Sequence, residues 1–161
     1  MAHYPLRSKH QEGRDSTVRK EVRRLVLYRF RRARAAYRDG RALVRKKSYE
    51  SAINRFYYAA FYSARALLAL KSLDSAKHKG VISLFHQHFV KPGFIDKERA
   101  RALARSFERR LDSDYQDFVM IGRSEALHVQ NDVNDFLRAC HHFFKSGIPS
   151  MRQRGIGKEK S

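Results

Sequence analysis

Apolar side chains recur every three or four residues along most of the chain, which is the spacing of one face of an α-helix. From Lys20 to about Lys46 they form a single stripe, and the other positions are mostly polar, with many arginines. From Ser48 to Ser72 the apolar face is wider, which indicates contact on two sides and predicts the central helix of a bundle. Gly40 weakens the first segment but need not end it.

Three further helices are predicted after this pair. The first runs from Ser75 to Val90 and is stopped by the proline and glycine that follow it. Asp96 is a good N-cap for the next helix, which should fray near residues 112–114, where Asp and Ser compete for backbone hydrogen bonds. The last is capped by Ser124 and ended by Gly147. Nothing alternates convincingly like a strand, so the predicted fold class is an all-α bundle.

The composition fits one domain with two basic ends. The 161 residues include eleven Phe and eight Tyr, enough for a packed core without disulfides. We expect a basic N-terminal arm at 1–17, a helical domain at 18–146 and a basic C-terminal tail at 147–161. Cys140 is the single cysteine, which fits a reducing compartment. With no apolar run long enough to span a bilayer and no hydrophobic leader, we expect a cytoplasmic protein.

The formal net charge of +19 changes the picture most. Residues 1–34 carry eleven Lys or Arg against three acids, and residues 147–161 carry four against one, so both ends are disproportionately basic. Such a surface attracts polyanions, of which nucleic acids are the usual intracellular ones. A basic protein with no polyanionic partner is the plainer alternative. An anionic membrane is less favoured, since the basic first helix turns its apolar face to a core.

Three blocks of sequence carry a family resemblance. They are "YESAINRFYYAAFYSARALLALKSL", "HKGVISLFHQHFVKPGFID" and "RRLDSDYQDF", in this order and at these spacings. The chain from about Ala35 to Phe143 resembles the HEPN superfamily, and most of all its prokaryotic branch that is often encoded beside a minimal nucleotidyltransferase. The resemblance implies an antiparallel bundle of four main helices plus a short one, and usually a homodimer with a polar motif from each subunit in a shared cleft.

The resemblance also implies a place for the chemistry. Ribonuclease members carry an arginine, four to six residues and then a histidine; here Arg110 and Asp114 fit the spacing, and Tyr115 stands where the histidine would be. Arg110 would hold the scissile phosphate with parallel hydrogen bonds. Asp114 and Tyr115 would handle protons, although a phenol with a pKa of about 10 is a weak substitute for imidazole. The plain alternative is an Arg110–Asp114 salt bridge on one helical face, with Tyr115 packed at the bundle edge.

Each of the further candidates has a plainer structural alternative. Arg123 and His128 match the arginine–histidine spacing literally, but they open the last helix, whereas the motif should follow the fourth helix directly. Candidate nucleotide or RNA ligands are Asn54, Arg55, Tyr58, His78 and Arg109. An ion pair for Arg55, core packing for Tyr58 and a capping role for His78 are the alternatives. The histidines show no spacing of metal ligands, so we predict no metal site and no cofactor.

Three functional hypotheses remain. The first is a toxin-like, metal-independent endoribonuclease that acts on RNA and pairs with a nucleotidyltransferase. The resemblance implies that this partner could transfer a nucleotide to Tyr115, where the added negative charge would block RNA entry. The second is a non-catalytic module that binds nucleotides or RNA, or serves the transferase as its partner subunit. The third is a structural helical adaptor, against which the basic ends argue.

Overall fold

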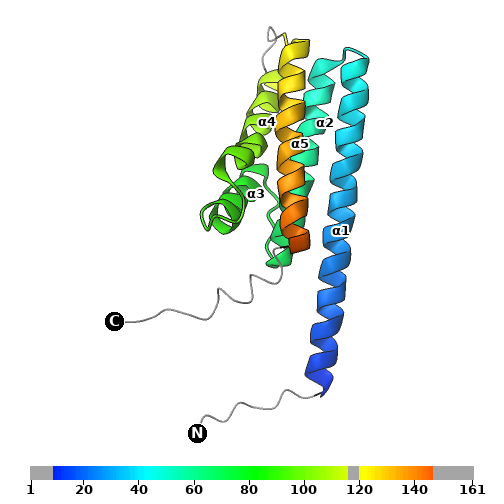
Figure 1. Ribbon diagram of the computed structural model, residues 1–161, viewed down its shortest axis with the longest axis vertical. Coiled ribbons are helices and arrows are strands. Elements are labelled where there is room, and N and C mark those ends of the chain that lie inside the picture. The colour runs from blue at the N-terminus through cyan, green and yellow to red at the C-terminus, as the bar shows by residue number, and fades with distance from the viewer. Residues whose placement is uncertain (1–8, 116–119, 147–161) are drawn as a thin grey trace, which may run out of the picture.

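The computed structural model describes residues 9–115 and 120–146, and the side chains of 13–112 and 120–146. This part of the chain forms five α-helices and one π-helix and contains no strand. The helices are α1 (Lys9–Arg45), α2 (Tyr49–Leu70), α3 (His78–Phe85), the π-helix η1 (His86–Val90), α4 (Lys97–Tyr115) and α5 (Arg123–Ser146). α1, α2, α4 and α5 run side by side, and α3 lies beside α4 at one end of the bundle (Figure 1). The predicted all-α bundle with four main helices is confirmed.

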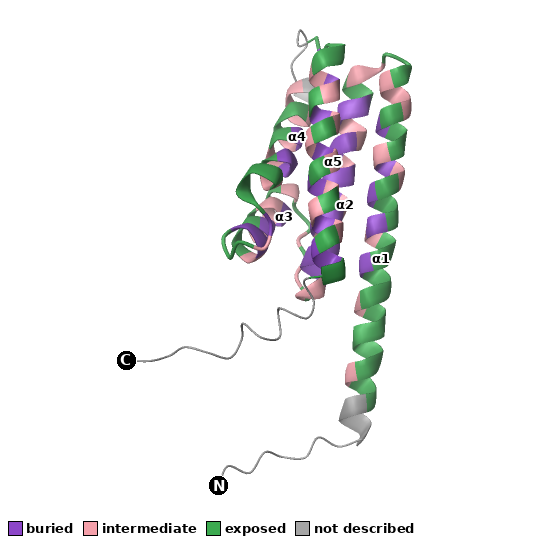
Figure 2. Ribbon diagram, viewed as in Figure 1, coloured by how far each residue is buried: buried purple, intermediate pink, exposed green. Residues whose placement is uncertain are grey.

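α1 is longer than the apolar stripe predicts. It begins at Lys9, inside the predicted arm, and continues through Gly40 as expected. Its first fully buried residue is Val26, and the turns before it project beyond the bundle and are mostly exposed (Figure 2). Polar residues with good helix propensity extend the helix here without a buried face. Because these turns have no apolar stripe, hydrophobic periodicity cannot predict them.

α1 and α2 form a tight antiparallel pair. Lys47 ends α1 with a left-handed φ of 59°, and the amide of Ser48 donates to the carbonyl of Leu43, which satisfies a carbonyl at the helix end. α2 ends in the same way, with Ser72 at φ 56° and the amide of Leu73 donating to the carbonyl of Leu68. Neither turn contains glycine.

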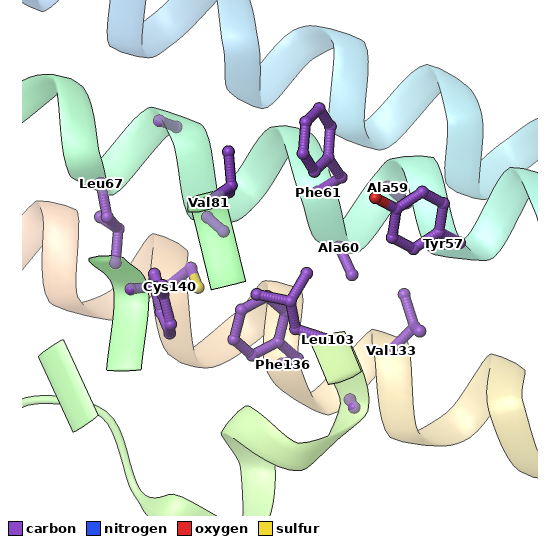
Figure 3. Close-up of a cluster of buried hydrophobic side chains, with 14 of the residues drawn as sticks. Tyr57, Ala59, Ala60, Phe61, Leu67, Val81, Leu103, Val133, Phe136 and Cys140 are labelled. Carbon is purple, nitrogen blue, oxygen red and sulfur yellow. The ribbon is translucent and has the colours of Figure 1, made fainter. Parts of the chain in front are cut away.

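α2 is the central helix, as its wide apolar face predicts. It packs against α1, α3, α4 and α5. Its buried positions include six alanines, which let the neighbouring helices approach closely. A continuous core joins α2 to the buried faces of the other helices, and Leu103, Phe136 and Cys140 lie near one another in it (Figure 3). Phe136 meets Phe85 edge to face at 5.4 Å between ring centroids.

The third predicted helix is shorter and less regular than expected. α3 begins only at His78. Ser75 lies in the loop before it, and its hydroxyl accepts a hydrogen bond from the amide of Lys77. α3 continues directly into the π-helix η1, which ends at Val90, before the proline and glycine as predicted. Gly93 adopts a left-handed φ of 82° in the turn that follows.

Of the N-caps predicted for the last two helices, one is confirmed and one is wrong. Asp96 accepts from the amide of Arg99 at 3.3 Å, which confirms it as the N-cap of α4. α4 remains helical through Tyr115, so the fraying predicted near residues 112–114 is not seen. The capping role predicted for Ser124 is wrong, because α5 already begins at Arg123 and Ala126 donates to the carbonyl of Gly122. Gly147, the predicted end of α5, lies outside the described residues.

No helix in the described ranges combines the length and apolar character needed to cross a membrane.

Candidate functional site

Arg110 rests on two tyrosine rings of the central helix. α4 carries the arginine, and its guanidinium carbon lies 5.4 Å from the ring centroids of both Tyr57 and Tyr58 on α2. The side chain is half-buried, as is Tyr58, while Tyr57 is fully buried. A guanidinium over aromatic faces is held by cation–π attraction and keeps its N–H groups at the ring periphery, where an anion can accept from them.

His78 comes from α3 into the same cluster. Its ring stacks on Phe61 at 4.6 Å and on Phe107 at 6.1 Å between centroids, both at 17° between planes. A hydrogen bond joins Nδ1 to the hydroxyl of Tyr57. Burial lowers the pKa of His78, and the charges of Arg110 and Arg65 lower it further. The cluster therefore places a preferentially neutral imidazole beside a permanent cation.

Tyr57 is suited to hydrogen bonding and not to ionisation. Burial raises its pKa well above that of a free phenol, against the opposing effect of the Arg110 charge. Its hydroxyl therefore stays protonated and links α2 to His78. The capping role considered for His78 is not observed, since Lys77 precedes the helix and the imidazole is engaged with aromatic rings.

Further contacts between arginines and tyrosines lie along α2 and reach α1. The guanidinium carbon of Arg55 lies 5.1 Å from the Tyr58 centroid, and Arg55 donates to the side-chain oxygen of Asn54 at 3.4 Å. One turn further, Arg32 of α1 lies 4.6 Å from the Tyr62 centroid and donates to its hydroxyl at 2.7 Å. We call this set the Arg/Tyr stripe, and its members are Arg32, Arg55, Tyr58, Tyr62 and Arg110.

Arg109 points elsewhere than its neighbour Arg110. It pairs with Glu125 at 2.9 Å and Asp112 at 3.9 Å. It lines a hollow of about 430 Å³ between α4 and α5, which we call the α4–α5 hollow and which His128 also lines. His128 is exposed and pairs with Asp132 at 3.5 Å. The structure thus brings Arg109 together with one half of the second arginine–histidine motif, and not with the Arg/Tyr stripe.

The remaining candidates stand apart or outside the described part. Arg123 is the exposed first residue of α5. The backbone of Asp114 and Tyr115 belongs to the last turn of α4, but their side chains lie outside the described residues. The predicted roles of these two residues, and the alternative Arg110–Asp114 ion pair, therefore stay predictions.

An ion-pair cluster fixes the end of α2 nearest α3. Arg65 donates to both carboxylate oxygens of Asp74, at 2.9 and 2.5 Å, and Arg29 of α1 donates to one of them at 2.8 Å. The hydrogen bonds from Arg65 are the main cause that lowers the pKa of Asp74 to about 2. This cluster ties α1, α2 and the α2–α3 loop together beside His78.

Sequence reasoning found much of this arrangement but missed Arg32 of α1 and Tyr62 of α2. Asn54, Arg55, Tyr58, His78 and Arg110 were each predicted from sequence. The contribution of Arg32 and Tyr62 was not, because it depends on how two helices meet. The only sequence signal was the four-residue spacing of Tyr58 and Tyr62, together with the arginine-rich face of the first helix. Within the described residues, no group of three or more His, Cys, Asp or Glu could hold a metal ion.

Comparison with known proteins gives a consistent result. The model of the HEPN domain matches residues 26–143, from α1 to near the end of α5. A UPF0332 protein of Thermotoga maritima is 36% identical over 123 residues, covering 76% of this chain and 88% of that protein. Two proteins of Methanocaldococcus jannaschii are named "Putative toxin MJ0605" and "Putative toxin MJ0142". The first is 37% identical over 98 residues, covering 61% of this chain and 70% of that protein. The second is 29% identical over 104 residues, covering 65% and 71%. The chain therefore belongs to the HEPN domain family.

Proposed function

We propose that this protein is an RNA-directed, toxin-like HEPN protein that acts as a metal-independent endoribonuclease. The toxin-like role draws on the names of two relatives. RNA as the target draws on the net charge of +19 and on the arginines that lie over aromatic rings. The observation that carries the proposal is the position of Arg110, whose half-buried guanidinium lies over the rings of Tyr57 and Tyr58. The imidazole of His78 is hydrogen-bonded to Tyr57 in the same cluster.

The proposed reaction assigns one task to each group. Arg110 binds the non-bridging oxygens of the scissile phosphate and stabilises the charge that develops on them. A base takes the proton of the 2′-hydroxyl, O2′ forms a bond to phosphorus, and the bond from phosphorus to O5′ breaks as O5′ takes up a proton. The products carry a 2′,3′-cyclic phosphate and a 5′-hydroxyl. Asp114 and Tyr115 are the proton-transfer candidates from α4, and His78 is the candidate from α3.

Incubation of total RNA with the protein in EDTA tests this assignment. The protein is purified without any nucleotidyltransferase, so that Tyr115 is unmodified. Cleavage that leaves 2′,3′-cyclic phosphate ends, and that Arg110→Ala reduces about a hundredfold or more, is expected from the loss of a charge-stabilising donor. Arg138→Ala, which removes an exposed arginine of α5, is the matched control and should cleave normally. Cleavage that survives in Arg110→Ala contradicts the proposal.

A second candidate function is binding without chemistry. Tyr115 occupies the position that the resemblance assigns to a histidine, which favours a module that holds RNA or a nucleotide, or one that serves as partner subunit of a nucleotidyltransferase. In the same assay this function predicts intact RNA with salt-sensitive binding that Arg110→Ala weakens. An absence of RNA binding at moderate salt contradicts the endoribonuclease and the RNA-binding form of the second candidate.

The assembly is part of the proposal. A homodimer would bring two copies of Arg110 into one cleft, and a cognate nucleotidyltransferase in the cytoplasm would act on Tyr115. A nucleotide added there would place negative charge beside Arg110 and oppose RNA entry.

A further inference from the structure

A second hollow lies between α1 and α2. It measures about 430 Å³, which is within the size range of small-molecule sites, and we call it the α1–α2 hollow. It is lined by two tyrosines, three arginines, one aspartate and two small residues, namely Tyr28, Tyr62, Arg31, Arg32, Arg55, Asp39, Ala35 and Ala36. The alanines leave the space, and the longer side chains surround it.

The cations of the α1–α2 hollow are not neutralised by the protein. Among the described residues, Arg31, Arg32 and Arg55 form no ion pair with a carboxylate, and Asp39 is the only acid that lines the hollow. The α4–α5 hollow has the same volume, but there Arg105 and Arg109 both pair with acids. Of these two hollows, only the one between α1 and α2 offers a surplus of positive charge to a ligand.

The tyrosines hold Arg32 in place and leave an aromatic face available. Arg32 donates to the hydroxyls of Tyr28 and Tyr62, at 3.3 and 2.7 Å, and its carbon lies 4.6 Å from the Tyr62 centroid. These contacts orient a guanidinium that is itself exposed. The Tyr28 side chain is 47% exposed at the rim, where a base can stack on it.

The α1–α2 hollow connects to the Arg110 cluster. Arg55 lines the hollow and also lies over Tyr58, the ring that Arg110 covers at 5.4 Å. The Tyr58 and Tyr62 centroids are 6.0 Å apart. Contacts between arginine and tyrosine side chains therefore continue without a break from Arg110 through Tyr58 and Tyr62 to Arg32. Arginines and aromatic rings together are the combination that binds single strands through phosphate contact and base stacking.

We propose that the α1–α2 hollow is a second nucleotide subsite, which binds one base and phosphate of a single-stranded RNA whose neighbouring nucleotide lies at Arg110. This assignment rests on the proposed function, because it extends the same RNA along the Arg/Tyr stripe. Asp39 at the edge of the hollow can accept a hydrogen bond from a ribose hydroxyl or a base amino group.

Binding of oligonucleotides of increasing length tests the subsite. The probes are AMP and fluorescein-labelled 2′-O-methyl oligoadenylates, which lack the attacking hydroxyl and so stay intact. Arg32→Ala removes the cation and Tyr28→Ala removes an exposed ring. Each is expected to weaken binding of the longer oligonucleotides about tenfold. Arg38→Ala, which removes an exposed arginine of the same helix outside the hollow, is the control and should bind like wild type.

The outcomes separate the subsite from the proposed function. If wild-type protein binds no oligonucleotide, the proposed function fails. If wild type binds but Arg32→Ala and Tyr28→Ala match Arg38→Ala at every length, the subsite is overturned while the proposed function stands. If these two variants lose a co-purifying protein partner and keep full RNA affinity, the hollow is a protein-docking surface and the subsite is likewise overturned. Circular dichroism confirms that each variant is folded.

Discussion

The guanidinium of Arg110 and the imidazole of His78 come from different helices and share the ring of Tyr57. The guanidinium lies over that ring, and the imidazole stacks against it at 5.6 Å and bonds to its hydroxyl. A fixed cation next to a histidine favours the neutral imidazole, and the pKa of His78 is lowered accordingly. Coupling between these two residues is therefore the property of the cluster to measure.

Removal of the Arg110 charge should raise the pKa of His78. Burial is the largest cause of its lowered pKa and Arg110 is the second, so Arg110→Ala removes a repulsive charge and admits water, and both changes favour the protonated ring. Two-dimensional NMR of the imidazole resonances across a pH titration measures the shift, with His78→Gln to assign the signal.

His141 supplies the control within the same spectra. Its pKa is lowered by burial and by Arg34 and Lys145, none of which Arg110→Ala alters. An unchanged titration of His78, or an equal shift of both histidines, would show that Arg110 does not act on this imidazole.

Prediction of these residues from the sequence was possible only in part. Arg110, Asn54, Arg55 and Tyr58 lie within blocks whose order and spacing are specific, so each was found. Arg109, the neighbour of Arg110 in sequence, was predicted to be a nucleotide or RNA ligand. On a helix, adjacent residues point about 100° apart, and this turn sends Arg109 to Glu125 and Asp112 instead.

At the scale of elements, the pairing of α1 with α2 depends on a close approach at Gly40. A Cβ built at this position would lie 2.5 Å from Cε1 of Phe56, whose ring is fully buried. The glycine therefore sits inside a helix because the neighbouring ring occupies the space of a side chain. A glycine inside a helix is destabilising, and the close packing against Phe56 that it permits offsets this effect.

Gly40→Ala and Gly13→Ala should have opposite effects on stability. Both substitutions lie in α1 and improve helix propensity, by about 1 kcal/mol in an open position. At Gly13 nothing lies within 4 Å of the added Cβ, so the free energy of unfolding should rise by about 0.5–1 kcal/mol, less where the helix end frays. At Gly40 overpacking against Phe56 should outweigh the gain and lower it by about 1–2 kcal/mol.

Urea unfolding followed by circular dichroism measures both variants. A stabilising effect of Gly40→Ala would mean that Phe56 moves aside without loss, and that the close approach does not fix the distance between the helices. The double variant Gly40→Ala with Phe56→Leu serves as a check, because the smaller side chain should relieve part of the clash.

Element prediction succeeded where burial follows the helical period and failed where it does not. The paired helices, the central position of α2 and the Asp96 cap all follow from local pattern. The extension of α1 to Lys9 has no apolar stripe to reveal it, and the change from α3 to η1 depends on packing against the rest of the bundle. The α1–α2 hollow lay beyond prediction because it needs the relative rotation of two helices.

At the scale of the whole molecule, the question is whether RNA would be held by diffuse charge or by one face. The chain has 35 Lys and Arg against 16 acids, so a general attraction to polyanions is expected from composition alone. The structure, however, distributes the pairing unevenly. Arg29, Arg65, Arg101, Arg105 and Arg109 have carboxylate partners, whereas among the described residues the three arginines of the α1–α2 hollow have none.

The salt dependence of RNA binding distinguishes the two cases. Each phosphate neutralised on a single strand contributes about −0.7 to the slope of log affinity against log salt. If the Arg/Tyr stripe holds the strand, Arg32→Ala and Arg110→Ala should each make the slope shallower by about 0.7, whereas Arg138→Ala on α5 should leave it unchanged. Diffuse attraction predicts the same small change for all three variants, because each removes one of many equivalent charges. Fluorescence anisotropy of a labelled 2′-O-methyl oligoadenylate at several potassium chloride concentrations provides the slopes. Equal slopes for Arg32→Ala and Arg138→Ala would therefore contradict a localised RNA-binding face on this bundle.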